Sequence, residues 1–169
     1  RNPTSLFKIQ KRGGKGKMGM TTKEEDFVSN LFIASTHSYI LFFTSIGKVY
    51  WLKVHELPLG GPTTKGKAIV NLLSLAPGET ITAMLPVREF SKDRNIVMGT
   101  KNGVVKKSDL MAYSNPRTGG IIALNLDEKD SLVAVDITDG SKDIILSTKN
   151  GKAIRFKEEE VREIGRVGR

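Results

Sequence analysis

One phrase recurs along this chain at intervals of about fifty residues, and such a repeat limits the possible fold more than any other feature. Each copy is a short run of β-forming residues, then a turn that contains glycine, then a second β-rich run. Thr44, Thr100 and Thr148 mark the same point in the three copies. Two β-rich runs joined by a tight glycine turn predict a β-hairpin in every copy.

The turns themselves carry a strong hairpin signal. Lys101-Asn102-Gly103 and Lys149-Asn150-Gly151 stand in the second and third copies, and Ser45-Ile46-Gly47 stands at the same point of the first. Asn and Gly both tolerate the positive φ that a type I′ turn requires. We therefore expect type I′ turns at the two Asn-Gly sites.

A second phrase repeats in step with the hairpins. Residues 66–72, Gly-Lys-Ala-Ile-Val-Asn-Leu, match residues 120–126, Gly-Ile-Ile-Ala-Leu-Asn-Leu. Glycines also stand about one period before and after these segments, at Gly16 and Gly168. Two phrases in register argue against the alternative reading, which is coincidence among β-rich segments. Several strands in each unit of about fifty residues indicate the blades of a propeller-like array.

The repeat divides a single all-β domain, residues 1–169, into successive units. The predicted units are the end of one blade at 1–30, a blade at 31–86, a blade at 94–136 and the start of a further blade at 143–169. Because a blade needs neighbours to cover its faces, we expect a segment of a larger array, about three to four blades long. Helices should be short, with residues 24–28 and 157–162 as the candidates.

Positive charge is concentrated at the N-terminus. The chain holds 27 Lys and Arg against 18 Asp and Glu, a formal net charge of +9. Residues 1–23 contain seven of the basic residues and no acidic residue. Such a patch predicts a polyanionic partner, most often nucleic acid; the alternative is a solvated basic terminus without a partner.

The stretch Gln10-Lys11-Arg12-Gly13-Gly14-Lys15-Gly16 lies within this patch. Its three glycines let backbone N–H groups approach a phosphate closely, and its three cationic side chains supply charge around that backbone. The stretch is not a nucleotide-binding P-loop, because the Lys-Ser/Thr pair and the glycine spacing before it are missing. It is therefore interpreted as a cradle for the phosphates of a nucleic acid.

The glycine loops of the later units are basic as well. One basic loop in each blade predicts a single rim along which duplex DNA meets phosphate contacts at regular intervals. A bent DNA path costs on the order of 1–6 kcal/mol for 20–30 base pairs, so several loops have to act together. The candidate DNA-binding residues are Lys8, Gln10, Lys11, Arg12, Gly13, Gly14, Lys15, Gly16, Lys17, Lys65, Lys67, Arg117, Arg166 and Arg169.

Gln10 to Gly16 resembles the seven-residue box Gln-Arg-Arg-Gly-Gly-Lys-Gly in the C-terminal domain of the DNA gyrase A subunit, with Lys11 where that family usually has Arg. The resemblance extends along nearly the whole chain. It includes Lys23-Glu24-Glu25-Asp26-Phe27, Thr36-His37, Gly47-Lys48-Val49-Tyr50, Ile69-Val70-Asn71-Leu72-Leu73, Ile81-Thr82-Ala83, Gly103-Val104-Val105-Lys106-Lys107 and Lys152-Ala153-Ile154-Arg155-Phe156-Lys157. It implies a β-pinwheel, a six-bladed propeller-like fold of which this chain is a part.

The resemblance also implies a function. Members of this family wrap double-stranded DNA around the rim, so that the holoenzyme introduces negative supercoils. The domain would then be non-catalytic, without a cofactor of its own, and joined to gyrase B and to the rest of the gyrase A subunit, in an A2B2 enzyme. ATP and Mg²⁺ would be used elsewhere in that enzyme, which also holds its catalytic tyrosine outside this segment. The expected location is the bacterial cytoplasm, at the nucleoid.

Other functional classes find little support in the sequence. The chain has no cysteine, which excludes disulfides and thiolate metal sites, and no apolar run long enough for a membrane helix. His37 and His55 lack metal-ligand spacing, and Trp51 is interpreted as packing rather than as a base-stacking platform. Two alternatives stay open: the related domain of topoisomerase IV, whose box is degenerate, and a kelch-like propeller that recognises proteins.

Overall fold

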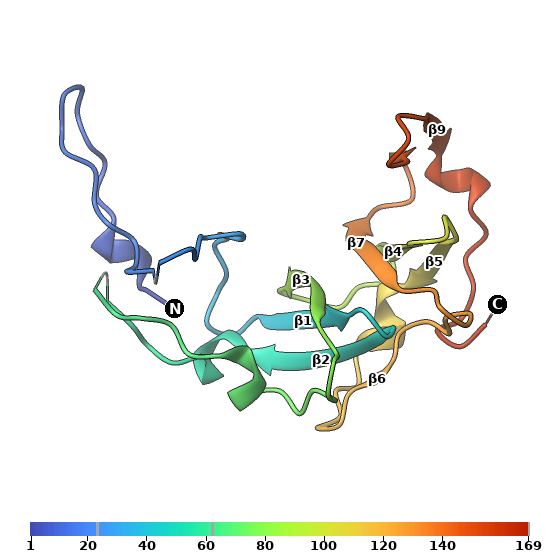
Figure 1. Ribbon diagram of the computed structural model, residues 1–169, viewed down its shortest axis with the longest axis horizontal. Coiled ribbons are helices and arrows are strands. Elements are labelled where there is room, and N and C mark those ends of the chain that lie inside the picture. The colour runs from blue at the N-terminus through green and yellow to red at the C-terminus, as the bar shows by residue number, and fades with distance from the viewer. Residues whose placement is uncertain (23, 62, 169) are drawn as a thin grey trace.

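The chain folds into a curved array of small antiparallel sheets with a long N-terminal arm (Figure 1). The computed structural model describes residues 1–22, 24–61 and 63–168. The strands are β1 (Tyr39–Thr44), β2 (Lys48–Lys53), β3 (Ile81–Val87), β4 (Asn95–Thr100), β5 (Val105–Asp109), β6 (Ile121–Ile122), β7 (Leu132–Thr138), β8 (Asp143–Ser147) and β9 (Ala153–Lys157). The 3-10 helices are η1 (Thr4–Leu6), η2 (Val54–Glu56), η3 (Ile69–Asn71), η4 (Leu110–Tyr113) and η5 (Glu158–Glu160). The predicted all-β class is confirmed.

The first sheet combines strands from two repeats. Its order is β3-β1-β2-β6, and all neighbours are antiparallel. β1 and β2 form the predicted hairpin, and β3 pairs with the other edge of β1. β6 comes from the following unit of the sequence and pairs with β2, with Ile121 opposite Val49 and Ile122 opposite Lys48. Backbone hydrogen bonds therefore join neighbouring repeats.

The second and third sheets follow the same plan. The second has the order β5-β4-β7, and its hairpin and third strand correspond to those of the first sheet. In both sheets the pairing with the third strand shifts by one residue at the threonine that ends the first strand, Thr44 or Thr100. The third sheet is the hairpin β8-β9. The boundaries predicted for the individual blades remain predictions.

The three hairpin turns share one conformation, which corrects the predicted turn type. In each turn the glycine N–H donates to the threonine carbonyl at 3.0 Å, and the glycine has a φ between +76° and +86°. Asn102 and Asn150 are not among the described residues with positive φ, so the type I′ prediction is wrong. A type I turn followed by a left-handed glycine forms instead. The threonine hydroxyl favours this form, because it accepts the N–H just after the glycine, as Thr100 does from Val104 at 3.2 Å.

The main core lies between the first two sheets. Strand β1 is buried on both faces, so Leu41 and Phe43 point into one cluster while Ile40 and Phe42 point into another. Side chains of a strand alternate between faces, and a strand covered on both sides reads as a continuous apolar run. Strand β4 contributes Ile96 and Met98 to the first cluster, together with Ala123 and Leu124 from the segment after β6.

Two buried carboxylates tie loops to the sheets. Glu79 accepts hydrogen bonds from the Thr44 hydroxyl at 2.6 Å, from the Tyr50 hydroxyl at 3.1 Å and from the Ala76 N–H at 2.8 Å. Glu158 is fully buried and accepts from Thr138 at 2.6 Å, as well as from Asn95, Gly140 and Lys142. Such donor sets compensate for the loss of water around a buried carboxylate.

The N-terminal arm precedes the first sheet and is held at its base. The amino group of Arg1 donates to the Pro58 carbonyl at 2.9 Å, and the Asn2 side chain donates to the Gly19 carbonyl at 3.1 Å. The predicted helix at residues 24–28 does not form, because Glu25 has a φ of +64°, which a right-handed helix excludes. The helix predicted at 157–162 is present as the shorter η5. No helix in the described ranges is long and apolar enough to cross a bilayer.

Candidate nucleic-acid interface

The box folds as a tight turn at the tip of the N-terminal arm. The Gly14 N–H donates to the Lys11 carbonyl at 2.9 Å, and Gly13 has a φ of +81°. A positive φ at the third turn residue defines a type II geometry, which favours glycine there. A Cβ on Gly14 would lie 2.6 Å from the Gln10 Oε1 and 3.0 Å from the Lys11 carbonyl oxygen. The turn itself therefore requires Gly13, before any ligand binds, while a side chain at Gly14 would displace the Gln10 side chain and crowd the Lys11 carbonyl.

The cations of this arm stand in solvent. Lys8, Lys11, Arg12 and Lys15 are exposed, and the described residues offer none of them a carboxylate within salt-bridge distance. Lys17 is also exposed, and its ammonium donates to the Leu6 carbonyl at 2.8 Å across the arm. Gln10 and Gly16 are exposed beside them. Unpaired cations on a glycine-rich backbone suit phosphate oxygens, onto which Arg can fork.

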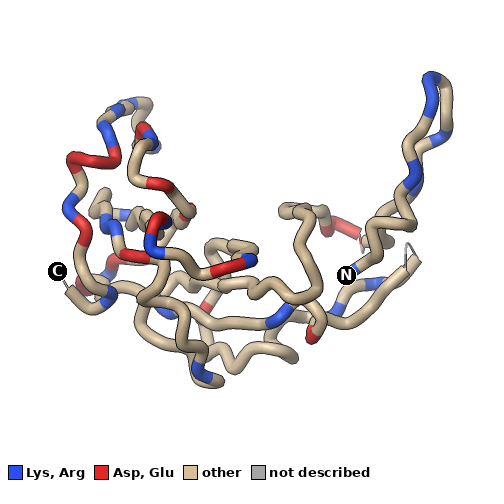
Figure 2. The backbone as a smooth tube through the Cα atoms, turned by 180° about the vertical axis from the view of Figure 1, so that it is seen from behind, with Lys and Arg blue, Asp and Glu red and all other residues tan. Residues whose placement is uncertain are grey.

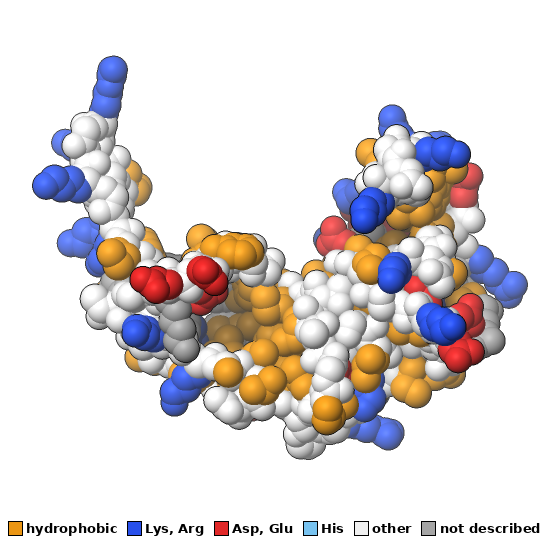
Figure 3. Space-filling view, viewed as in Figure 1, with side chains coloured by type: hydrophobic (Ala, Val, Ile, Leu, Met, Phe, Trp, Pro, Cys, Tyr) orange, Lys and Arg blue, Asp and Glu red, His pale blue; other side chains and the backbone are white. Residues whose placement is uncertain are grey.

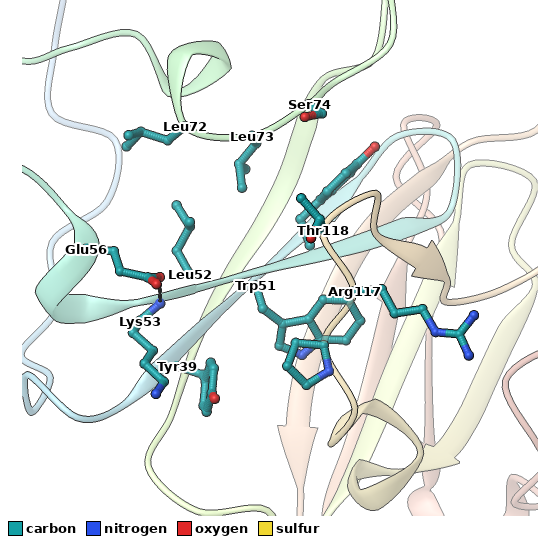
Figure 4. Close-up of a pocket in the computed structure, with 12 residues that line it drawn as sticks. Tyr39, Trp51, Leu52, Lys53, Glu56, Leu72, Leu73, Ser74, Arg117 and Thr118 are labelled. Carbon is teal, nitrogen blue, oxygen red and sulfur yellow. Dashed lines mark hydrogen bonds between the residues drawn. The ribbon is translucent and has the colours of Figure 1, made fainter.

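The three later basic loops differ from one another. Lys65 and Lys67 are exposed in the loop before η3. Arg117 is also exposed, and its guanidinium points away from the neighbouring pocket (Figure 4). Arg166 is half-buried instead, and its guanidinium donates to the Ile122 carbonyl. Arg169 lies outside the described residues.

These loops are spread around the curved array. In Figure 1 the box loop ends the arm at the upper left, residues 58–61 and 63–68 lie at the left, the loop before β6 lies at the bottom and the C-terminal segment at the right. The tube in Figure 2 shows basic positions without acidic ones toward the end of the arm, while basic and acidic positions alternate at the other end of the molecule. Figure 3 shows basic side chains projecting outward from the arm. The box thus stands apart at the tip of the arm, and the later loops follow one another around the array.

A pocket beside Arg117 shows how one loop sits against the preceding sheet (Figure 4). It is lined by residues of β1 and β2, by the segment 72–74 and by the segment 116–118. The Trp51 indole N–H donates to the Tyr113 carbonyl at 2.9 Å, and the side chain is buried. Trp51 therefore packs, as predicted. The Lys53 ammonium lies 5.5 Å from the centre of the Tyr39 ring.

Groups suited to chemistry are not gathered here. His37 and His55 are exposed, and within the described part of the chain no three His, Cys, Asp or Glu side chains cluster as metal ligands would. The Tyr113 hydroxyl is buried and donates to the Ala123 carbonyl at 3.3 Å. Burial raises the pKa of Tyr113 to about 12, which keeps the phenol neutral at physiological pH. The Tyr113 hydroxyl is therefore part of the core rather than of an exposed site.

The sequence did not predict that Lys106 and Lys107 are buried. Both look like rim cations, yet both are buried. The Lys107 ammonium donates to the Glu158 carbonyl at 2.9 Å, and the Lys106 ammonium donates to the Arg166 and Gly168 carbonyls. The phase of the repeat was the available signal, because it aligns this pair with the buried Tyr50 and Trp51.

Successive antiparallel sheets, of which the first is completed by a strand of the following repeat, define a β-propeller type of repeat domain. The model of the family described as "DNA gyrase C-terminal domain, beta-propeller" matches residues 1–35, 38–88, 94–139 and 142–169. The chain therefore belongs to the DNA gyrase C-terminal domain family. This confirms the resemblance seen in the box and in the later motifs.

Individual relatives agree with the family. The DNA gyrase A subunit of Haemophilus influenzae is 48% identical over 165 residues, which are 98% of this chain and 19% of that protein. The DNA gyrase A subunit of Clostridium acetobutylicum is 51% identical over 160 residues, covering 95% of this chain and 19% of that protein. The chain thus spans about a fifth of the length of these relatives.

Solved structures share the fold. A C-terminal domain of DNA topoisomerase IV superposes with a TM-score of 0.73 and 33% identity, covering 78% of this chain and 41% of that one. A DNA gyrase A C-terminal domain superposes with a TM-score of 0.65 and 21% identity, covering 96% of this chain and 52% of that one. The predicted partial array of a propeller-like domain is consistent with both.

Proposed function

We propose that this chain binds duplex DNA and bends it around its curved array, as the wrapping domain of a DNA gyrase A subunit. The observation that carries the proposal is the series of basic glycine loops spread around the curved array, led by the exposed cations of the box. Phosphates would be the main ligands, because exposed Lys and Arg around flexible glycine turns recognise charge rather than base edges. Sequence preference should therefore be weak.

The curvature of the array supports wrapping over simple binding. A straight duplex could touch the box at the tip of the arm but not the loops at the bottom and right of Figure 1 as well. A duplex that contacts all of them has to bend, at a cost on the order of 1–6 kcal/mol for a site of 20–30 base pairs. Lys8, Lys11, Arg12, Lys15 and Lys17 at the arm would anchor the wrap, and Lys65, Lys67 and Arg117 would continue it.

The parent enzyme defines the wider role. In this proposal the segment acts with the rest of gyrase A and with gyrase B in an A2B2 enzyme that uses ATP and Mg²⁺ elsewhere. Its catalytic tyrosine lies outside the segment, and the domain itself needs no cofactor. The wrap presents DNA to the enzyme so that turnover adds negative supercoils. The place of action is the bacterial cytoplasm, at the nucleoid.

A linking-number assay tests the proposal. The chain is bound to nicked circular DNA, the nick is sealed with ligase, the protein is removed and the topoisomers are separated on a gel. A positive shift that grows with protein concentration is the expected result of chiral wrapping. Salt-sensitive binding without any shift would leave DNA binding intact and refute wrapping by this segment. Absence of binding at low salt would refute both DNA binding and wrapping, and would favour a propeller that recognises proteins.

A second candidate is the corresponding domain of topoisomerase IV. The TM-score of 0.73 and 33% identity to a solved domain of that enzyme favour it. The nearly intact box at Gln10 to Gly16 favours gyrase instead, because the box of the topoisomerase IV family is degenerate. Replacing the box cations should abolish the linking-number shift only if the gyrase assignment is right.

A further inference from the structure

The second strands of the first two hairpins, β2 and β5, each carry two adjacent buried side chains whose place in the repeat is the same. Tyr50 lies opposite Phe42, and Lys106 lies opposite Met98, two residues before the threonine that ends the first strand of its hairpin. Trp51 and Lys107 follow at the next position. The pair Tyr50–Trp51 in β2 therefore corresponds to the pair Lys106–Lys107 in β5, although the residues differ completely in chemistry.

The first position of each pair contacts the glycine loop of the following repeat. A Cβ on Gly120 would lie 2.9 Å from Cε1 of the Tyr50 ring, so that loop packs directly on the phenol. The Lys106 ammonium donates to the Gly168 carbonyl at 3.0 Å and also to the Arg166 carbonyl. Gly120 and Gly168 occupy the same place in their repeats. The Tyr50 ring and the Lys106 ammonium thus hold equivalent loops.

The second position contacts the 3-10 helix of the following repeat. The Trp51 indole N–H donates to the carbonyl of Tyr113 in η4 at 2.9 Å. The Lys107 ammonium donates to the carbonyl of Glu158 in η5, also at 2.9 Å. Each pair therefore makes one contact with a helix and one with a glycine loop of the next unit.

The surroundings of the two lysines exclude a direct role in binding phosphate. Lys106 is 5% exposed and Lys107 is 8% exposed, whereas the cations of the box are open to solvent. Carbonyl oxygens replace water around their ammonium groups, since a buried cation needs such partners. Burial, together with the nearby Arg166, lowers the pKa of Lys106.

We propose that Lys106 and Tyr50 are positioning residues. Each holds the basic glycine loop of the following repeat in the position in which that loop can contact DNA. Trp51 and Lys107 fix the helix that leads into each loop. This inference rests on the proposed DNA wrapping, because the loops matter as phosphate contacts. It assigns to two lysines of a basic protein a role that does not involve touching DNA.

Lys106→Met tests the proposal, because it keeps the aliphatic stem and removes the donor, and Lys106→Arg should restore the contact. The control, Lys101→Met, removes the same charge from the exposed turn of the same hairpin. Limited trypsin digestion compares cleavage after Arg166 with cleavage after Lys149. In Lys106→Met we expect the ratio to rise about tenfold, the equivalent of one lost charge-assisted hydrogen bond. General unfolding would accelerate both cleavages and leave the ratio unchanged.

DNA supplies the second readout. At saturating protein, Lys106→Met should lose at least half of the linking-number shift while its affinity for linear duplex falls less than about threefold. Lys101→Met and Lys106→Arg should retain the shift. An unchanged cleavage ratio with an unchanged shift would overturn the role of Lys106. If the unsubstituted chain gives no shift but the ratio still rises, the loop contact stands and the wrapping proposal fails.

The first repeat provides an independent variant. Tyr50→Leu removes the ring on which Gly120 packs, and it should raise cleavage after Arg117 relative to cleavage after Lys149. Tyr50→Phe keeps the ring and loses only the hydroxyl that donates to Glu79, so it should leave that ratio within twofold of the original. Equal effects of the two substitutions would refute packing on the ring as the cause.

Discussion

Gly120→Ala should test how tightly successive repeats are joined, and Gly119→Ala is its matched control. Gly120 has a φ of +71°, and its Cβ would lie 2.9 Å from both the Tyr50 ring and the Val49 carbonyl oxygen. Gly119 has no positive φ, and a Cβ there would meet nothing within 4 Å. The left-handed backbone alone costs an alanine about 1–2 kcal/mol, and relief of the overlap about 1–3 kcal/mol more.

The expected loss of unfolding free energy for Gly120→Ala is therefore about 2–5 kcal/mol, while Gly119→Ala should stay within about 0.5 kcal/mol. Urea denaturation followed by the fluorescence of Trp51 measures both, since the chain has a single tryptophan and its indole contacts the loop-bearing repeat at Tyr113. The alanine at 120 should also change the emission of the native state. Equal stabilities of the two variants would refute the idea that this loop is clamped on Tyr50.

Three further outcomes follow from the structure. Arg12→Ala combined with Lys15→Ala should make the slope of log K against log salt shallower by about 2, because two phosphate contacts are lost. The double variant should still bind DNA weakly but should give no linking-number shift. Equal loss of binding and of the shift would refute the anchoring role of the box. Gly13→Ala should weaken DNA binding because the φ of +81° at this position disfavours an alanine, whereas Gly19→Ala, with open space around it and no positive φ, should leave fluorescence-anisotropy affinities unchanged. Tyr113 has a pKa of about 12 in the folded chain and about 10 in the unfolded chain, so the folded state favours the neutral phenol. The corresponding contribution to the unfolding free energy, about 3 kcal/mol, is fully present below pH 10 and is lost as the pH rises toward 12. Tyr113→Phe should therefore show a flatter decline of unfolding free energy between pH 10 and 12, and identical declines in circular-dichroism titrations would contradict this.

The spacing of threonines and glycines was enough to predict the three hairpins. Thr44, Thr100 and Thr148 each end the first strand or directly follow it, as the phase of the repeat required. The turn type was mispredicted, because Asn-Gly propensity describes isolated two-residue loops. Here the threonine hydroxyl accepts the N–H just after the glycine and favours a longer turn.

The exposure of the charged residues could also be predicted only in part. The cations of the box are exposed, as a glycine-rich basic stretch would suggest, because no neighbouring segment covers them. Arg166, Lys106 and Lys107 look equally basic in the sequence, yet they are half-buried or buried. Their environments depend on which segment of the next repeat packs against them, and composition holds no information on that.

Local propensity and residue identity at a fixed spacing were sufficient to predict the all-β repeat, and the resemblance of its motifs to a known family indicated the family. They could not predict that β6 completes the sheet of the preceding repeat, that Glu79 and Glu158 are buried among donors, or that a lysine pair replaces Tyr50–Trp51 as the contact between repeats. The physical reason is that these features are pairings between residues far apart in the chain, which form only when the repeats pack together. A buried cation or carboxylate is tolerated only where distant backbone groups converge on it.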